Sequence, residues 1–99
     1  MLRMDRDRTG NVRLTFVLPS DEPPGRVSVV GDFNGWRPGE HELRRRSNGT
    51  RSLAVTVPAG TPVRFRYLAE NDHWANERDH PDVRQVGDDS LIIAALPPK

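Results

Sequence analysis

Residues 27–36 read V-S-V-V-G-D-F-N-G-W, and this stretch decides the fold. Three of its first four residues are valines with one serine between them, which predicts a buried or half-buried strand. Asn34 and Gly35 then form a strong turn dipeptide, because both residue types tolerate a positive φ. The stretch therefore predicts a strand that ends in a tight loop.

Two aromatic residues flank this turn. We expect Phe33 to anchor the loop in the core and Trp36, just past the turn, to face outward. A tryptophan held on a turn at the end of a strand is a rigid, flat and partly solvated surface. Such a surface suits stacking against the apolar face of a sugar ring.

Similar short strand patterns lie on both sides of this stretch. Alternating or continuous apolar residues predict strands at 12–18, 52–57 and 63–69, a weaker strand at 41–46, a short returning strand at 73–75 and a closing strand at 90–96. Turn residues separate them about every 8–12 residues, with a second Asn-Gly pair at 48–49, and no segment shows a sustained helical period. The pattern predicts an all-β sandwich.

The chain is 99 residues long, which suits one domain. Residues 1–10 carry charges of alternating sign and predict a flexible, solvated lead-in. The strand patterns lie within residues 11–96, and residues 97–99 form a tail. Residues 76–89 are polar, contain proline and glycine, and predict a long irregular loop. We therefore expect a single domain over residues 11–96.

The composition excludes several classes of partner. Fifteen Lys and Arg residues against 14 Asp and Glu residues leave a net charge of only +1, so nucleic acid is not expected to bind. The absence of cysteine excludes disulfides and Cys-based zinc sites. No run of 18 apolar residues occurs, and the first residues resemble neither a signal peptide nor an anchor. We expect a cytoplasmic protein without a membrane partner.

No arrangement of residues predicts catalysis. The three histidines, His41, His73 and His80, lack the spacing of metal ligands, and no serine lies in a nucleophile elbow. The carboxylates at 79–89 lie in a polar loop, without the apolar surroundings that raise the pKa of a catalytic acid. We therefore expect a non-catalytic domain without a metal or cofactor.

A surface for carbohydrate is predicted around residues 63–74. If the alternating apolar residues of 63–69 face the core, Arg64 and Arg66 project from the outer face of the sheet. Trp74 follows the next turn and would return alongside them. Glycan recognition combines aromatic rings, which contact the C–H face of a sugar, with charged or amide groups, which bind its hydroxyls.

The hexapeptide G-D-F-N-G-W at residues 31–36 resembles the G-x-F-N-x-W signature of the family-48 carbohydrate-binding modules. These include the glycogen-binding domain of the AMP-activated kinase β subunit and the early-set domains of isoamylases and branching enzymes. The resemblance extends from about residue 12 to residue 96. It implies an immunoglobulin-like early-set sandwich of two antiparallel sheets with about seven short strands. It also implies that Trp36 and Trp74 stack on sugar, and that Arg66 occupies a basic hydrogen-bonding position that is usually lysine.

A third contact region of the family is a loop that resembles L-G-T-x-N-N. Here residues 86–91 read V-G-D-D-S-L, so the resemblance places Val86 at the leucine, Asp88 at the threonine and Ser90 at an asparagine. The last two are departures, since serine is shorter than asparagine and aspartate adds charge beside a neutral ligand.

Two functions therefore remain open. The first is a non-catalytic module that binds an α-glucan such as glycogen, starch or a maltooligosaccharide. The second is a protein-interaction or regulatory early-set domain, associated with a glucan-metabolising enzyme, whose sugar site is partly lost. Asp88 and Ser90 favour the second, and the tryptophan pair favours the first. Exposure of both tryptophans on one surface would discriminate them.

Overall fold

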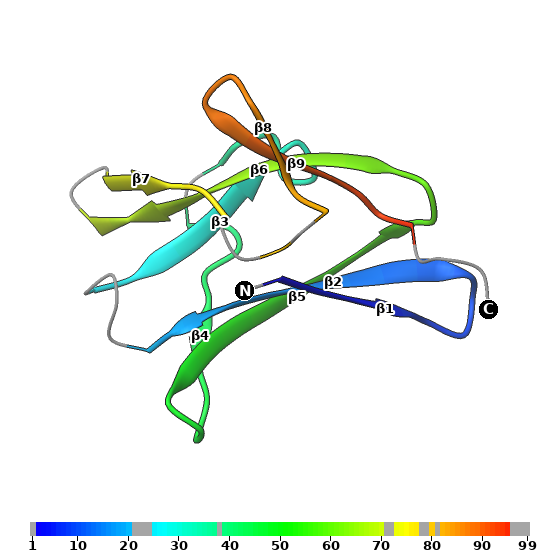
Figure 1. Ribbon diagram of the computed structural model, residues 1–99. Helices are drawn as coiled ribbons and strands as arrows, with labels where there is room; N and C mark the ends of the chain where they lie inside the picture. The colour runs from blue at the N-terminus through cyan, green and yellow to red at the C-terminus, as the bar shows by residue number, and fades with distance from the viewer. Residues whose placement is uncertain are drawn as a thin grey trace.

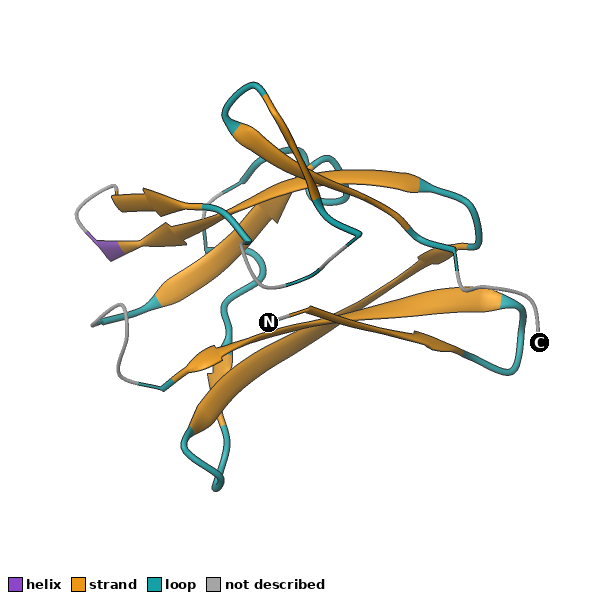
Figure 2. Ribbon diagram, in the orientation of Figure 1, coloured by secondary structure: helices purple, strands orange, loops and turns teal. Residues whose placement is uncertain are grey.

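The computed structural model describes residues 2–20, 25–37, 39–70, 73–77, 80 and 82–95. They form two antiparallel sheets packed face to face (Figure 1). Apart from a helical turn at Glu70, strands and loops make up this part of the chain (Figure 2). The strands are β1 (Leu2–Arg6), β2 (Asn11–Pro19), β3 (Val27–Gly31), β4 (Arg44–Arg45), β5 (Thr50–Pro58), β6 (Pro62–Ala69), β7 (His73–Ala75), β8 (Arg84–Val86) and β9 (Asp89–Ile93).

The first sheet, called sheet A, has the strand order β1-β2-β5-β4, and the second, sheet B, has the order β3-β6-β9-β8. Strand β6 is central in sheet B, because β3 pairs with one of its edges while β9 and β7 share the other. Strand β9 pairs with residues 62–65 of β6, and β7 pairs with residues 67–69. Residue 66 therefore lies where the two short strands meet.

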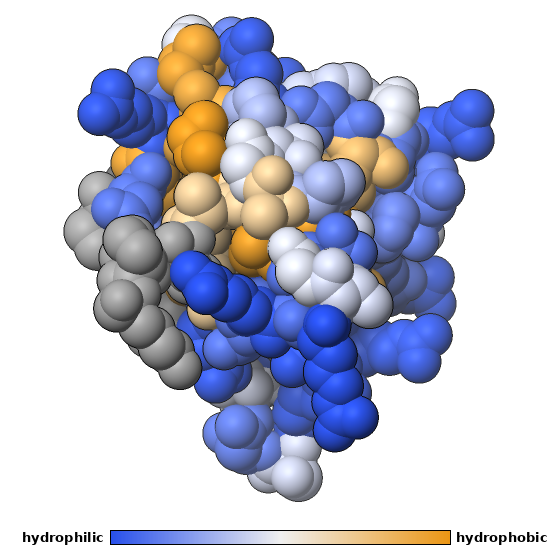
Figure 3. All heavy atoms as spheres, turned by 90° about the vertical axis from the view of Figure 1, so that its right-hand side faces the viewer, coloured by the Kyte–Doolittle hydropathy of each residue, from blue (hydrophilic) through white to orange (hydrophobic). Residues whose placement is uncertain are grey.

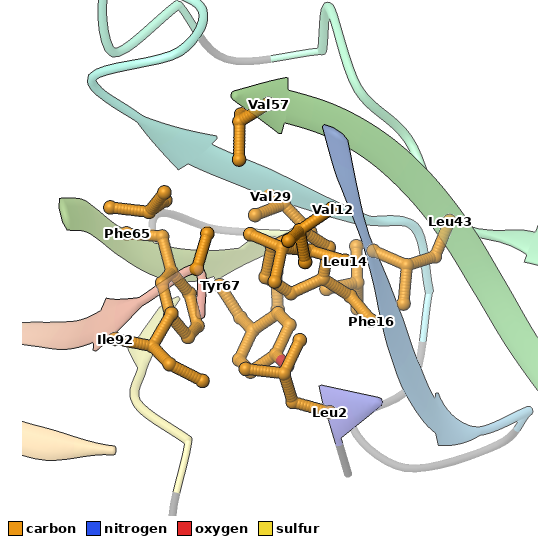
Figure 4. Packing of buried hydrophobic residues seen from close by; sticks show 14 residues of the cluster. Leu2, Val12, Leu14, Phe16, Val29, Leu43, Val57, Phe65, Tyr67 and Ile92 are labelled. Atoms are coloured by element: carbon orange, nitrogen blue, oxygen red, sulfur yellow. The ribbon is translucent and has the colours of Figure 1, made fainter. Parts of the chain in front are cut away.

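The core lies between the sheets and has aromatic rings at its centre (Figure 4). The ring of Phe16, from sheet A, meets the rings of Phe65 and Tyr67, from sheet B, edge-on, with centroids 5.0 and 6.2 Å apart. Such a pair adds about 0.5–1.5 kcal/mol beyond the burial of apolar area. The alternation predicted for residues 12–18 and 63–69 is confirmed, since Val12, Leu14 and Phe16 are buried on one side, and Val63, Phe65 and Tyr67 on the other.

Residues 41–45 connect the two sheets. The backbone N–H of Val29 donates to the carbonyl of His41, and that of Leu43 donates to the carbonyl of Val27, so this segment first follows the free edge of β3. Arg44 and Arg45 then pair with β5 in sheet A. The weak strand predicted at 41–46 is thus a crossing between sheets, of which only β4 is a strand. Leu43, its one strong apolar residue, is buried in the core.

The fold class is confirmed as an all-β sandwich of two antiparallel sheets, but the described residues form nine strands in place of about seven. One added strand is β1, in the segment expected to be a flexible lead-in. Leu2 is buried and Met4 packs against the core, while the charged residues of the strand, Arg3, Asp5 and Arg6, are exposed, as an edge strand allows. The segment 1–10 therefore contributes to the sheet.

The other added strand is β8, which lies within the predicted irregular loop 76–89. It forms a hairpin with β9 through a turn in which Gly87 has a φ of +60°. The predicted end of the closing strand at Leu96 and the tail 97–99 lie outside the described residues.

The outer surface is largely polar. On the face shown in Figure 3, charged and polar side chains cover most of the area, while apolar side chains gather in the upper half, on the side of sheet B. Ile93, on the outer face of β9, is 48% exposed. In the part of the chain that the structure describes, no helix is long and apolar enough to cross a membrane.

Candidate functional site

Asn34 shapes the loop that follows β3. Its side chain is buried, and its Oδ1 atom accepts a hydrogen bond of 3.1 Å from the backbone N–H of Gly31. Its Nδ2 atom donates to the carbonyl oxygen of Val29 at 3.0 Å and lies 3.0 Å from Nδ1 of His41. An amide NH₂ is only a donor, so the histidine nitrogen accepts. One side chain thus joins the end of β3 to the turn and to the segment that leaves it.

The loop holds one ring inward and one outward. Phe33 stacks on Phe16 of the core, with ring centroids 6.1 Å apart. Trp36 is half-buried and has a φ of +61°, which is uncommon for a bulky residue, and its N–H donates to the carbonyl of Gly31 at 2.9 Å. A Cβ atom at Gly31 would collide with the carbonyl oxygen of Arg64 and come within 2.7 Å of the Phe33 ring. Only glycine lets the loop fold so closely onto β6.

Arg66 joins the two tryptophans into one surface. It projects from the outer face of β6 and is 27% exposed. Trp74, on β7, is paired with Leu68 of β6 and is 43% exposed. The guanidinium carbon of Arg66 lies 4.5 Å from the centroid of the Trp74 ring and 6.0 Å from that of Trp36, within the range of cation–π attraction. The two rings therefore border the same guanidinium group.

Asp89 completes this cluster and was missed by the sequence analysis. Its Oδ1 atom lies 2.9 Å from Nε of Arg66, and its Oδ2 atom lies 3.1 Å from Nη2 of Arg64. The Arg66 Nε atom is shielded from solvent and lacks hydrogen-bond geometry, so this contact is an ion pair. Knowledge of the strand pairing would have predicted this contact. Phe65 pairs with Ser90 in antiparallel strands, so Asp89, the residue before Ser90, lies opposite Arg66.

Ser90 lies on the opposite face of β9 and corrects one prediction. Its side chain is fully buried, donates to Oδ1 of Asn76 at 2.9 Å and accepts from the N–H of Glu77 at 3.1 Å. Since neighbouring residues of a strand face opposite sides, its hydroxyl cannot reach a ligand on the outer surface. Its role is to hold the segment that follows β7 against β9.

The other residues predicted for the site lie around the β8–β9 turn and the Trp36 loop. Val86, at the end of β8, is half-buried, and its carbonyl accepts a bond of 3.4 Å from Nη2 of Arg64. Asp88 is exposed in the turn, and its carbonyl accepts a bond of 3.0 Å from Nδ2 of Asn76. Gly35 is exposed, with a φ of +64°.

This surface presents two indole rings and a guanidinium group whose charge a carboxylate opposes. Among the described residues, no group of three His, Cys, Asp or Glu side chains is placed to hold a metal ion.

Parts of the chain are similar to bacterial 1,4-alpha-glucan branching enzymes. It is 50% identical over 42 residues, 42% of its length, to GlgB 2 of Xanthomonas campestris pv. campestris (strain 8004). It is 39% identical over 57 residues, 57% of its length, to GlgB of Rhodopseudomonas palustris (strain HaA2). With GlgB of Burkholderia lata it shares 35% identity over 80 residues, 79% of its length. These segments cover 6%, 8% and 10% of the respective enzymes, and no family model matches the chain.

Proposed function

We propose that this domain is a non-catalytic module that binds α-glucan through Trp36 and Trp74. The observation that carries the proposal is the position of the Arg66 guanidinium, which borders both indole rings. Two aromatic faces around one polar group match a sugar chain, which has apolar C–H faces and hydroxyl rims. The resemblance of residues 31–36 to the family-48 modules points in the same direction.

Glucosyl rings stack on the indole faces that Arg66 leaves uncovered, and their hydroxyls bind the guanidinium N–H groups that Asp89 does not occupy. Each stacking contact is worth about 0.5–1.5 kcal/mol, by analogy with aromatic pairs. A single site is therefore weak. A polymer with many equivalent sugar units compensates, because a released unit is replaced by its neighbour.

The relatives support a glucan context for this chain. Each is a 1,4-alpha-glucan branching enzyme, and the shared segments cover a tenth or less of it. A small all-β domain suits the targeting of such an enzyme to its polymer better than the chemistry itself. We accordingly propose a glucan-metabolising enzyme as a protein partner.

A tryptophan fluorescence titration tests the proposal directly. The chain has only two tryptophans, so its whole indole signal comes from Trp36 and Trp74. We expect a saturable change with β-cyclodextrin or maltoheptaose and none with cellohexaose, which is β-linked. Trp74→Ala and Trp36→Ala should each weaken binding about 2–12-fold, the equivalent of one stacking contact. No change at millimolar α-glucan would refute glucan binding.

The second candidate is a protein-interaction or regulatory domain on the same scaffold. Burial of Ser90 favours it, because that hydroxyl cannot contribute to the polar rim of a sugar site. The exposed Ile93 on the same outer face also suits a protein contact. A domain of this kind would not respond to maltoheptaose but would bind the associated enzyme, so the same titration separates the two functions.

A further inference from the structure

The guanidinium group between the tryptophans is held by a carboxylate. Arg66 is a long side chain that, on a free strand surface, would sample many rotamers and lose freedom on binding a ligand. Here Oδ1 of Asp89 lies 2.9 Å from its Nε atom, and the guanidinium lies over the Trp74 ring at 4.5 Å. The position of the Arg66 guanidinium group is therefore already fixed in the absence of a ligand.

Asp89 is itself held in place. Its side chain is only 17% exposed, and its second oxygen lies 3.1 Å from Nη2 of Arg64. Arg64 is anchored in turn, because its Nη2 donates to the carbonyl of Val86 at 3.4 Å. A carboxylate fixed between two arginines cannot follow Arg66 if that side chain moves, so it selects one Arg66 conformation.

We propose that Asp89 is the positioning residue of this surface: it holds Arg66 over Trp74 and neutralises part of the positive charge of Arg64 and Arg66, which lowers the affinity of the site for an anionic glucan relative to an uncharged one. This inference rests on the proposed function and adds a residue and a selectivity to it. Asp89 acts through Arg66 and does not itself contact sugar.

A double-mutant cycle separates this role from a merely structural one. Asp89→Asn, Arg66→Gln and the double variant are titrated calorimetrically with β-cyclodextrin. We expect Asp89→Asn to weaken binding about 5–10-fold, the size of one cation–π or charge-assisted contact. In the Arg66→Gln background the same change should have no further effect. An equal loss in both backgrounds would overturn the inference, since Asp89 would then act independently of Arg66.

Two readouts report on the arginine itself. Without sugar, Asp89→Asn should increase acrylamide quenching of tryptophan fluorescence, because the guanidinium no longer shields one indole face. The affinity ratio of β-cyclodextrin to sulfated β-cyclodextrin should fall at least about threefold, because the positive charge of Arg64 and Arg66 is no longer partly neutralised. Asp5→Asn, which removes an exposed charge on β1 of sheet A, is the matched control and should change neither. Unchanged quenching and an unchanged ratio in Asp89→Asn would overturn the inference.

The outcomes distinguish the two proposals. If the wild-type domain does not bind β-cyclodextrin, the proposed function fails and the role of Asp89 fails with it. If the wild type binds and Asp89→Asn binds equally well, only the role of Asp89 fails. Circular dichroism checks that each variant is folded.

Asp89→Glu keeps the charge on a longer side chain and should restore at least half of the binding free energy that Asp89→Asn loses. If this variant is folded but does not restore binding, positioning of Arg66 by the carboxylate charge would be contradicted.

Discussion

Replacement of Asn34 by alanine should destabilise the whole domain, although the residue lies in a loop. The substitution removes the acceptor of the Gly31 N–H and the donor to the Val29 carbonyl, both near the buried end of β3. A buried backbone group left without a partner costs about 1–3 kcal/mol. Because water can partly replace the lost hydrogen bonds, we expect the free energy of unfolding to fall by about 2–4 kcal/mol, from a total of about 5–15 kcal/mol for a domain of this length.

The assay is urea unfolding followed by far-ultraviolet circular dichroism, with Asn48→Ala as the matched control. Asn48 occupies the other Asn-Gly turn, where its Oδ1 accepts hydrogen bonds from the N–H and hydroxyl of Thr50 at 3.3 and 2.6 Å. These groups are exposed or half-buried, so water can replace the lost bonds and the cost should stay below about 1 kcal/mol. Thermal unfolding should show the same contrast, with a fall of at least about 8 °C for Asn34→Ala.

The same variant also tests the link from the turn to the surface. Loss of Asn34 should release Trp36 from its positive φ and move it away from Arg66, so that indole emission shifts to longer wavelength in the folded state. An equal loss of stability in Asn34→Ala and Asn48→Ala would refute the prediction, because the buried hydrogen bonds of Asn34 would then stabilise the domain no more than the exposed ones of Asn48.

Two further predictions concern Ser90 and Asp7. Ser90→Ala should cost about 1–3 kcal/mol in urea unfolding, because the N–H of Glu77 and Oδ1 of Asn76 lose a buried partner; weaker glucan binding with unchanged stability would instead place Ser90 at the ligand. Hydrogen bonds from the Thr9 hydroxyl above all, together with those from the N–H groups of Thr9 and Asn11, hold the pKa of Asp7 below its usual value. A lowered pKa contributes stability above the unfolded-state pKa and loses it as the pH falls through the folded-state pKa. Asp7→Asn should therefore lower the melting temperature at pH 7 and leave it unchanged near pH 2, whereas an equal effect at both pH values would contradict the charge-based explanation.

Much of the fold followed from local patterns. The side chains of a strand alternate between its faces, so the buried face of residues 63–69 and the outward direction of Arg66 could be predicted without knowing which strands pair. The segment 1–10 could not be predicted in this way, since its charges indicated solvent. Its place as β1 depends on the burial of Leu2 against residues distant in the chain.

The sequence by itself determined the strand–turn–tryptophan unit at 27–36, because turn chemistry and strand periodicity are properties of neighbouring residues. Only the tertiary structure decided the composition of the surface. A shift of one residue in register exchanges the two faces of a strand, so the pairing of β9 with β6 turned Ser90 into the core and Asp89 toward Arg66. The meeting of β7 and β9 on one edge of β6, which no local pattern contains, then brought Trp74 to the same guanidinium.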